Sequence, residues 1–514
     1  MNIAMNPTAF LIAAPLLALL VFSPFKHDSS GDQPKVRQAA VAGTFYPADP
    51  KVLSAMIDDL LAKASGPQIS EPIIAVVAPH AGYEYSGPVA AYTYAQLKGH
   101  KYTRVVVIAP THYVSFDFTS VYDGDAYTTP LGQVPVDKEF ARRLVKMSST
   151  MQLSDKGHQA TADAPEHSVE VQLPWLQKVL GDFELVPIVM GDQSYENSRA
   201  LGVALAKLIK SEGKPGETLV LASSDLSHYH PYDDAVTIDH KTLNALQAWD
   251  YFSMSRNFQW RGPGQPGIWE ACGGAPIVAA MIYAERMGAN QAKVLKYENS
   301  GDVTGDHSRV VGYSADVFVK ADSGKALEIP FSLSDAEKSE LLALARRSVE
   351  YVVKERFAYE PAASTSATLN QERGAFTTLK KSGELRGCIG YTSAVKPLFI
   401  TVRDTATLAA MQDPRFTPVT AEELPKLEYE ISVLSPLRRV TDIQQIKVGQ
   451  HGLLMKNGDS EGLLLPQVPT EQGWDRKTFL EQTCRKAGMS STCWMDDDTD
   501  IFGFTAVVFG EHKP

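Results

Sequence analysis

The stretch IIAVVAPHAGYEYS, residues Ile73–Ser86, decides the fold class because it contains an apolar run that ends at a proline and a histidine. The residues before Pro79 are small or branched and apolar, which is typical of a strand covered on both faces. Pro79 has no N–H to donate to a neighbouring strand, so we expect the strand to end there and to place His80 at its carboxyl end. In an open α/β sheet, ligands bind at this edge.

Similar apolar runs alternate with helical patterns from about Val36 to residue 320. We expect strands at 73–78, 105–109, 185–190, 219–222 and 310–319. We expect helices at 89–97, 169–180, 198–210, 237–249 and 277–287. This alternation predicts a layered α/β fold with a mainly parallel sheet.

The pattern changes near residue 320, where a polar segment with glycine and proline predicts a linker at 323–333. We therefore expect an N-terminal segment at 1–33, one domain at 34–322 and a second at 334–514. Ser334 and Glu337 have the spacing of a capping box, which predicts a helix start. The short strands that follow are less regularly interleaved with helices, which predicts a smaller α+β domain.

Composition excludes several classes of protein. The 514 residues carry 49 Lys and Arg against 60 Asp and Glu, a net charge of −11, so we expect no nucleic-acid partner. Four cysteines are too few for a disulfide scaffold, and the sequence leaves open whether Cys484 and Cys493 pair. The segment Gly262–Gly267, GPGQPG, matches a dinucleotide-binding pattern by letter, but its prolines remove N–H donors and we interpret it as a turn.

The N-terminal segment contains an apolar run, Ala9–Phe22, that is shorter than the 20 or so residues of a spanning helix. No Lys or Arg precedes it, so the positive region of a secretory signal is missing. Two interpretations stay open: a weak membrane tether or signal, and a segment without topological meaning. We expect a cytoplasmic protein, with membrane association through Ala9–Phe22 as the alternative.

Polar residues recur where the other segments end. These residues are His112 in VVVIAPTH, Asp225 and His228 in LVLASSDLSH, Glu166 and His167 in EHSVEVQLPW, and Cys272 in EACGGAPI. We expect Glu166 and His167 at the start of a helix, and Cys272 beside a helix N-terminus that lowers its thiol pKa. A cleft with this content suits a metal site of imidazole and thiolate ligands. The alternative is metal-free acid–base chemistry by Asp225 and His228.

The motifs APHAGY, APTH, EHS, SSDLSH and ACGGAPI, in this order, resemble the Memo family over about Val36–Lys320. That family resembles class III extradiol-type non-haem iron dioxygenases in fold, with two histidines and a cysteine as its metal-ligand pattern. The resemblance implies His80, His112 and Cys272 as ligands of iron or copper. It also implies an acid–base role for His228, with Asp225 beside it to orient it.

The segments LRGCIG, DPRF and ISVLSP resemble the AMMECR family over about Ser332–Gly510. The stretch most typical of that family is Arg386, Gly387, Cys388, Ile389 and Gly390. One interpretation is a tight turn with a surface cation and a buried thiol. The other is a binding cleft in which Arg386 holds an anion and Cys388 acts as a thiolate.

The two families occur together with a radical SAM protein in the AmmeMemoRadiSam system, as its components B and A. The resemblance therefore implies a B–A fusion, with a radical SAM protein and an unknown small-molecule or protein substrate as partners. Three functions follow as hypotheses. The first is a redox metalloenzyme using iron or copper, and the second is a non-catalytic binding or scaffold protein with the same fold. The third is metal-free hydrolysis or modification of a protein or RNA.

Overall fold

A computed structural model describes residues 34–258, 270–321, 331–362, 364–366, 368–392, 394 and 396–511. Residues 36–514 belong to one compact unit. The apolar run at 9–22, the GPGQPG turn and most of the predicted linker lie outside the described residues.

The central sheet contains all five strands predicted for the N-terminal part. Its four central strands are parallel, in the order β2 (Ile73–Ala78), β11 (Thr218–Ser223), β3 (Arg104–Pro110) and β10 (Glu184–Met190). Outside them lie β14 (Val310–Val319), β12 (His228–His230), β13 (Gln291–Asn299), β4 (Thr119–Val121) and β7 (Met151–Leu153). Strands β14 and β4 join the central strands in antiparallel fashion, so the sheet is mixed, with a parallel centre.

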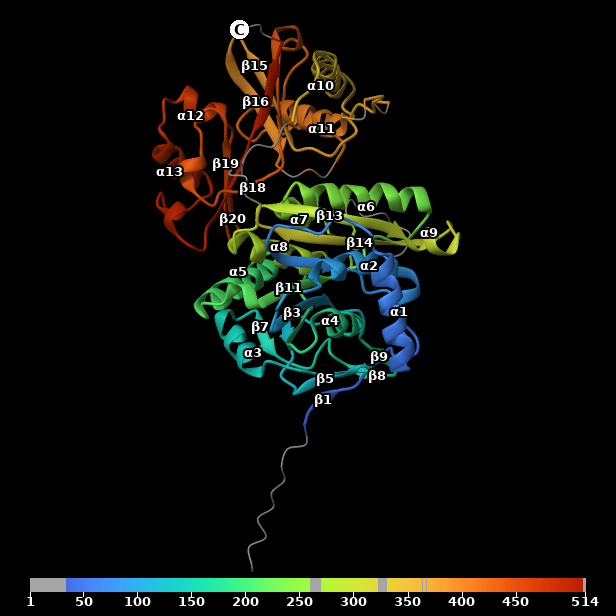
Figure 1. Cartoon of the computed structure of the whole chain (residues 1–514). Coiled ribbons are helices and arrows are strands. Elements are labelled where there is room, and N and C mark those ends of the chain that lie inside the picture. The colour runs from blue at the N-terminus through green and yellow to red at the C-terminus, as the bar shows by residue number, and fades with distance from the viewer. Residues whose placement is uncertain are drawn as a thin grey trace, which may run out of the picture. The chain divides into compact units, whose positions relative to one another are not determined.

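Helices cover both faces of this sheet (Figure 1). Alternate residues of a strand point to opposite faces, so Val76 joins one apolar cluster and Val77 the other. The Val76 cluster includes residues of α1 (Pro50–Lys63), α2 (Tyr83–Leu97) and α4 (Leu173–Leu180). The Val77 cluster includes residues of α3 (Lys138–Leu144), α5 (Tyr195–Ser211), α6 (Tyr232–Gln247), α7 (Tyr251–Asn257) and α8 (Gly274–Arg286). The expected layered α/β fold is therefore observed.

Smaller elements complete this part of the chain. They are β1 (Val36–Arg37), β5 (Ala126–Thr129), β6 (Gly132–Pro135), β8 (Ala160–Thr161), β9 (Ala164–Pro165) and α9 (Ser300–Thr304).

One predicted helix begins later than expected. A 3₁₀ turn occupies Glu170–Gln172, and α4 begins only at Leu173. The reason is Pro174, which has no N–H for an interior helical bond and is tolerated only in the first turn. Glu166 and His167 therefore lie in a loop before the helix, and their predicted place at a helix start is wrong.

The C-terminal part begins with α10 (Asp335–Glu355), and Ser334 and Glu337 form the predicted capping box. One sheet has the order β16 (Glu384–Tyr391), β15 (Ala375–Lys381), β17 (Leu427–Leu434) and β22 (Ala506–Gly510). The other has the order β18 (Arg438–Arg439), β21 (Asp500–Phe504), β19 (Gly452–Asn457) and β20 (Ser460–Leu464). The helices are α11 (Leu398–Met411), α12 (Gln467–Glu471) and α13 (Arg476–Lys486). Cys484 of α13 forms a disulfide with Cys493.

Two apolar clusters belong to the C-terminal part alone, one beneath α10 and α11 and one beneath α13. The Val77 cluster of the N-terminal part continues into residues of the C-terminal part, including Phe502 and Phe504. Within the described residues, no helix combines the length and the apolar character that crossing a membrane requires.

Candidate metal centre

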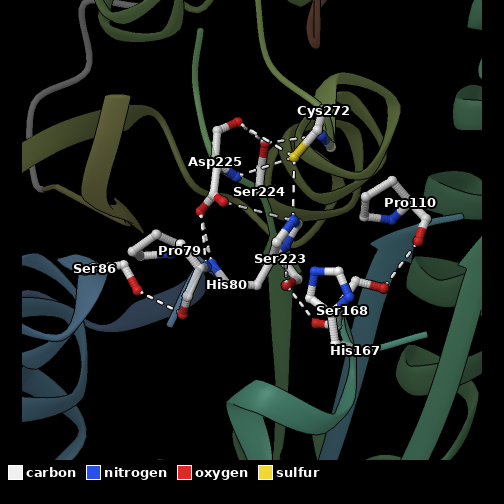
Figure 2. Close-up of polar contacts among 12 residues, drawn as sticks. Pro79, His80, Ser86, Pro110, His167, Ser168, Ser223, Ser224, Asp225 and Cys272 are labelled. Carbon is white, nitrogen blue, oxygen red and sulfur yellow. Dashed lines mark hydrogen bonds and ion pairs between the residues drawn. The ribbon is translucent and has the colours of Figure 1, made fainter. Parts of the chain in front are cut away.

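The carboxyl ends of β2, β3 and β11 meet at one edge of the sheet, because the three strands are parallel neighbours. His80 follows β2, His112 follows β3, and Ser223 ends β11 with Asp225 just beyond. The rings of His80 and His112 stand edge to face, with their centroids 5.1 Å apart. The strand ends therefore converge at this edge, where Figure 2 shows His80 beside Ser223 and Asp225.

His80 is buried, and a hydroxyl group determines which of its ring nitrogens carries the proton. Ser223 Oγ donates to the Ser168 carbonyl at 2.6 Å and accepts from Gln172 Nε2 at 2.7 Å. Its one proton is therefore used, so at 2.8 Å it accepts from His80 Nδ1. The lone pair of His80 is left on Nε2. Burial and the neighbouring His112 lower the pKa of His80 well below its ordinary value, which keeps the ring neutral.

His112 is oriented by a carboxylate. Its Nδ1 donates to Glu166 Oε1 at 2.9 Å, and its backbone N–H donates to Glu166 Oε2 at 2.7 Å. A carboxylate only accepts, so Nδ1 of His112 holds a proton, and Nε2 is the nitrogen that carries the lone pair when the ring is neutral. Burial lowers the pKa of His112, but hydrogen bonds to Cys272 and Glu166 outweigh it and raise the pKa to about 10.

Cys272 lies against His80, with Sγ 3.2 Å from His80 Nε2 (Figure 2). Two backbone contacts hold it there: Cys272 N–H donates to the Asp225 carbonyl at 3.2 Å, and Gly273 N–H donates to Ser224 Oγ at 2.9 Å. A Cβ at position 273 would lie 2.3 Å from the Ser223 carbonyl oxygen, so glycine permits this approach. Burial raises the pKa of the Cys272 thiol, so the lowering expected from the helix N-terminus is wrong for this geometry.

A third imidazole, His167, belongs to the same cluster. Ligand nitrogens of His80, His112 and His167 lie within 4.8 Å of one another, and the rings of His112 and His167 stack at 4.7 Å. Nδ1 of His167 is buried and has no hydrogen-bond partner. Burial and His112 lower the pKa of His167 to about 4. The sequence placed His167 in the cleft without a role, and no local signal distinguished it as a donor.

Asp225 and His228 do not form the orienting pair that the resemblance implied. Asp225 Oδ1 accepts from the backbone N–H groups of His80 at 2.8 Å and Ala81 at 3.3 Å, and burial raises the pKa of Asp225. His228 Nδ1 instead contacts the Leu226 carbonyl at 2.9 Å, which fixes the proton on Nδ1. His228 begins the short strand β12 rather than standing in a loop. Asp225 therefore positions the turn that carries His80, because its carboxylate accepts from two backbone N–H groups of that turn.

Sequence reasoning also missed Ser223 and Gln172, although both lie in quoted motifs. Each follows an apolar residue at the end of a segment, where a polar residue is common and does not by itself indicate a functional role. Only the hydrogen bonds that join them to His80 reveal their role.

The RGCIG motif of the C-terminal part lies on strand β16 instead of forming a tight turn. Arg386 donates to both carboxylate oxygens of Glu423, at 3.0 and 2.9 Å. Cys388 N–H donates to Asp413 at 2.8 Å, and the half-buried Cys388 thiol accepts from Thr378 Oγ1 at 3.2 Å. These contacts favour a structural role, because an internal carboxylate already occupies the Arg386 guanidinium.

Fold and site define an α/β protein with histidines and a thiol gathered at the carboxyl edge of a partly parallel sheet. Residues 37–317 match the family model described as Memo-like protein, and residues 342–509 match the model described as AMMECR1. The chain belongs to the Memo-like protein family, with an AMMECR1 region following in the same chain.

Two relatives that are named MEMO1 family proteins agree with this assignment. A MEMO1 family protein of Methanopyrus kandleri, MK0963, is 39% identical over 292 residues, which cover 55% of this chain and 98% of that protein. A MEMO1 family protein of Sulfolobus acidocaldarius is 38% identical over 291 residues, covering 54% of this chain and 97% of that protein. A crystal structure of the uncharacterised protein PH0010 from Pyrococcus horikoshii is 40% identical, with a TM-score of 0.35. It covers 36% of this chain and 96% of that chain.

Proposed function

We propose that this chain is a metal-dependent redox enzyme that binds iron or copper through His80, His112 and Cys272. A bound redox metal would supply electron transfer and a position for oxygen or substrate. The resemblance to class III extradiol-type dioxygenases belongs to this proposal. We also propose that a radical SAM protein of the same system is the partner. We further propose that the chain is divided into domains at 34–322 and 334–514.

One observation carries the proposal: both ligand histidines have their Nδ1 protons held by acceptors, Ser223 and Glu166. Nε2 is thereby the nitrogen of each ring that a metal can bind, and the sulfur of Cys272 lies 3.2 Å from Nε2 of His80. Ligating histidines commonly donate their other ring N–H to a carboxylate or similar group, which fixes the ring and raises its basicity. A donor set of two imidazoles and one thiolate suits iron, copper or zinc.

The protein groups around this site have separable tasks. Glu166 orients His112, and Asp225 holds the backbone of His80. His228 keeps its Nδ1 proton on the Leu226 carbonyl, so its Nε2 can accept and return a proton. We propose His228 as the acid–base group. His228→Ala should retain metal and slow turnover about 10²–10⁴-fold, whereas loss of metal would make His228 a ligand.

The metal test uses the full chain, reconstituted under reducing conditions with iron(II) or copper(I) and analysed by mass spectrometry of bound metal. Wild type should bind metal, and Cys272→Ser with His80→Ala should lose it. Cys388→Ser is the matched control, because Cys388 is the other half-buried free thiol. If wild type binds neither metal, or the double variant binds as wild type does, the proposal is wrong.

His167 offers a second donor set, because its nitrogen lies with those of His80 and His112. His167→Ala separates the two sets: metal lost from this variant but kept in Cys272→Ser would assign a three-histidine site.

The second candidate function is a non-catalytic binding or scaffold protein that retains the fold. The thiol that stands in place of a carboxylate ligand favours the scaffold function, since a thiolate ligand changes the redox potential of a bound metal. The wild-type protein would first be shown to bind metal. If its His80→Ala variant then still performed the cellular role of the protein, the scaffold function would be supported.

A further inference from the structure

A carboxylate of the C-terminal part, Asp500 on β21, lies among charged groups of the N-terminal helices. Asp500 Oδ2 accepts from Tyr195 Oη at 3.0 Å and from Arg199 Nε, both on α5. Asp500 Oδ1 accepts from Arg286 at the end of α8 at 3.0 Å, and from Arg439 of β18 at 3.2 Å. One carboxylate thus joins two helices of the N-terminal part to two strands of the C-terminal part.

This ionic cluster is withdrawn from water. The Asp500 side chain is 2% exposed, and burial alone would raise its pKa, but Arg199, Arg439 and Arg286 outweigh burial and lower it. Glu285 on α8 is a second buried acid: it lies 3.6 Å from Arg439 and accepts from Tyr251 Oη at 3.0 Å. Removing one member of such a cluster leaves buried charge without compensation, which is costly.

Apolar contacts surround the ionic cluster. The ring of Phe502 on β21 lies 4.8 Å from that of Phe252 and 6.0 Å from that of Tyr251, both on α7. Arg438 donates to the carbonyl of Ala248 at 2.8 Å, and Lys456 pairs with Glu196 at 3.3 Å. Buried aromatic residues, desolvated arginines and a polar rim are the usual composition of a specific protein interface.

We propose that α5, α7 and the end of α8 form a docking surface that binds the AMMECR1 region even without the covalent link. Asp500 of the AMMECR1 region is the central residue of this interface. The contacts are those of an interface between partners, because Asp500 of one part is compensated by Arg199 and Arg286 of the other, and Arg439 lies near Glu285 of the other. A linker then adds local concentration and no contact. The surface is separate from the metal proposal, so either can fail alone.

The test cuts the full chain. A specific protease site is inserted within residues 322–330, the intact protein is purified and cleaved, and the product is analysed by size-exclusion chromatography at low micromolar concentration. The two fragments should elute together at the size of the uncut 56.1 kDa chain. Fragments that elute separately would overturn the proposal.

Variants identify the residue responsible. Asp500→Asn keeps the shape of the side chain and removes its charge, and after cleavage it should weaken association roughly 100-fold or more. Asp459→Asn, at an exposed position between β19 and β20, is the matched control and should behave as wild type.

Arg199→Ala tests the same contact from the other side and decides the matter if Asp500→Asn does not fold, as judged by circular dichroism of the uncut chain. If a folded Asp500→Asn protein associates as tightly as wild type, Asp500 is not the central residue of the interface. If Asp500→Asn does not fold, the same result with Arg199→Ala leads to the same conclusion.

Discussion

The histidine cluster of the Memo region and the RGCIG cluster of the AMMECR1 region both gather polar residues at motifs typical of their families. They differ in what their polar atoms contact. Around Glu423 and Asp413, each cation has an anion within hydrogen-bond distance: Arg386 and Lys381 contact Glu423, and Arg415 contacts Asp413. Around His80, acceptors hold the Nδ1 protons of His80 and His112, and Nε2 of each ring is left as the nitrogen that a metal can bind.

This difference teaches how to separate a site from a structural motif. A buried polar atom without a partner costs free energy, so natural proteins keep few of them without a reason. His167 Nδ1 is such an atom, and one ring nitrogen of His167 lies within 4.8 Å of ring nitrogens of His80 and His112. The RGCIG cluster, by contrast, satisfies its charges internally and needs no ligand. Three substitutions test this rule, beginning with the one expected to have the largest effect.

Asp316 could break the rule, because it has a buried unpaired oxygen away from the histidine cluster. It lies on β14, its Oδ1 has no hydrogen-bond partner, and burial raises its pKa to about 7. Between its ordinary pKa of 3.8 and about 7, the folded state binds more protons than the unfolded state, so stability falls as pH rises. At about 1.4 kcal/mol per pKa unit, the loss above pH 7 is at most about 4 kcal/mol.

Asp316→Asn should therefore be more stable than wild type at pH 8, with a smaller difference at pH 5. Chemical denaturation of metal-free protein at both pH values measures this difference, with Asp459→Asn as the exposed control. A pH-independent difference would mean that Asp316 is ionised in the folded protein and that its unpaired oxygen needs another explanation.

Asp413→Ala tests the structural side of the comparison. It removes the acceptor of the Cys388 N–H and the partner of Arg415, so we expect about 1.5–3 kcal/mol of destabilisation. Denaturant titration measures the loss, and metal content should not change. Unchanged stability together with altered metal binding would show that the RGCIG cluster is functional after all.

Glu166→Gln sharpens the ligand side. The substitution keeps the shape of the side chain and removes the charge that holds the His112 proton, so metal affinity should fall about 10–100-fold. Competition with a chelator of known affinity measures the change. Glu170 is buried against Arg37, so Glu170→Gln is an unsuitable control, and Glu139→Gln at an exposed position of α3 serves better. An affinity equal to that of wild type would separate His112 from the metal.

Local pattern was sufficient for much of the fold. The strand at 73–78 and the capping box at Ser334 were predicted because each depends on residues adjacent in the chain. Strands alternating with helices predicted the layered architecture, and the parallel centre then brought His80 and His112 to one edge. The helix predicted at 169–180 begins only at Leu173, because a single residue, Pro174, outweighed the periodicity of its first turn.

By itself, the sequence determined which residues end the strands and which side chains are available at the sheet edge. Only the tertiary structure decided that Ser223 holds the His80 proton, that Glu166 rather than Asp225 orients a histidine, and that Asp500 lies among arginines of another region. The physical reason is that strand formation depends on neighbours in the chain. A proton's position or a buried charge depends on groups that folding brings together from distant positions, such as 80 and 223 or 199 and 500.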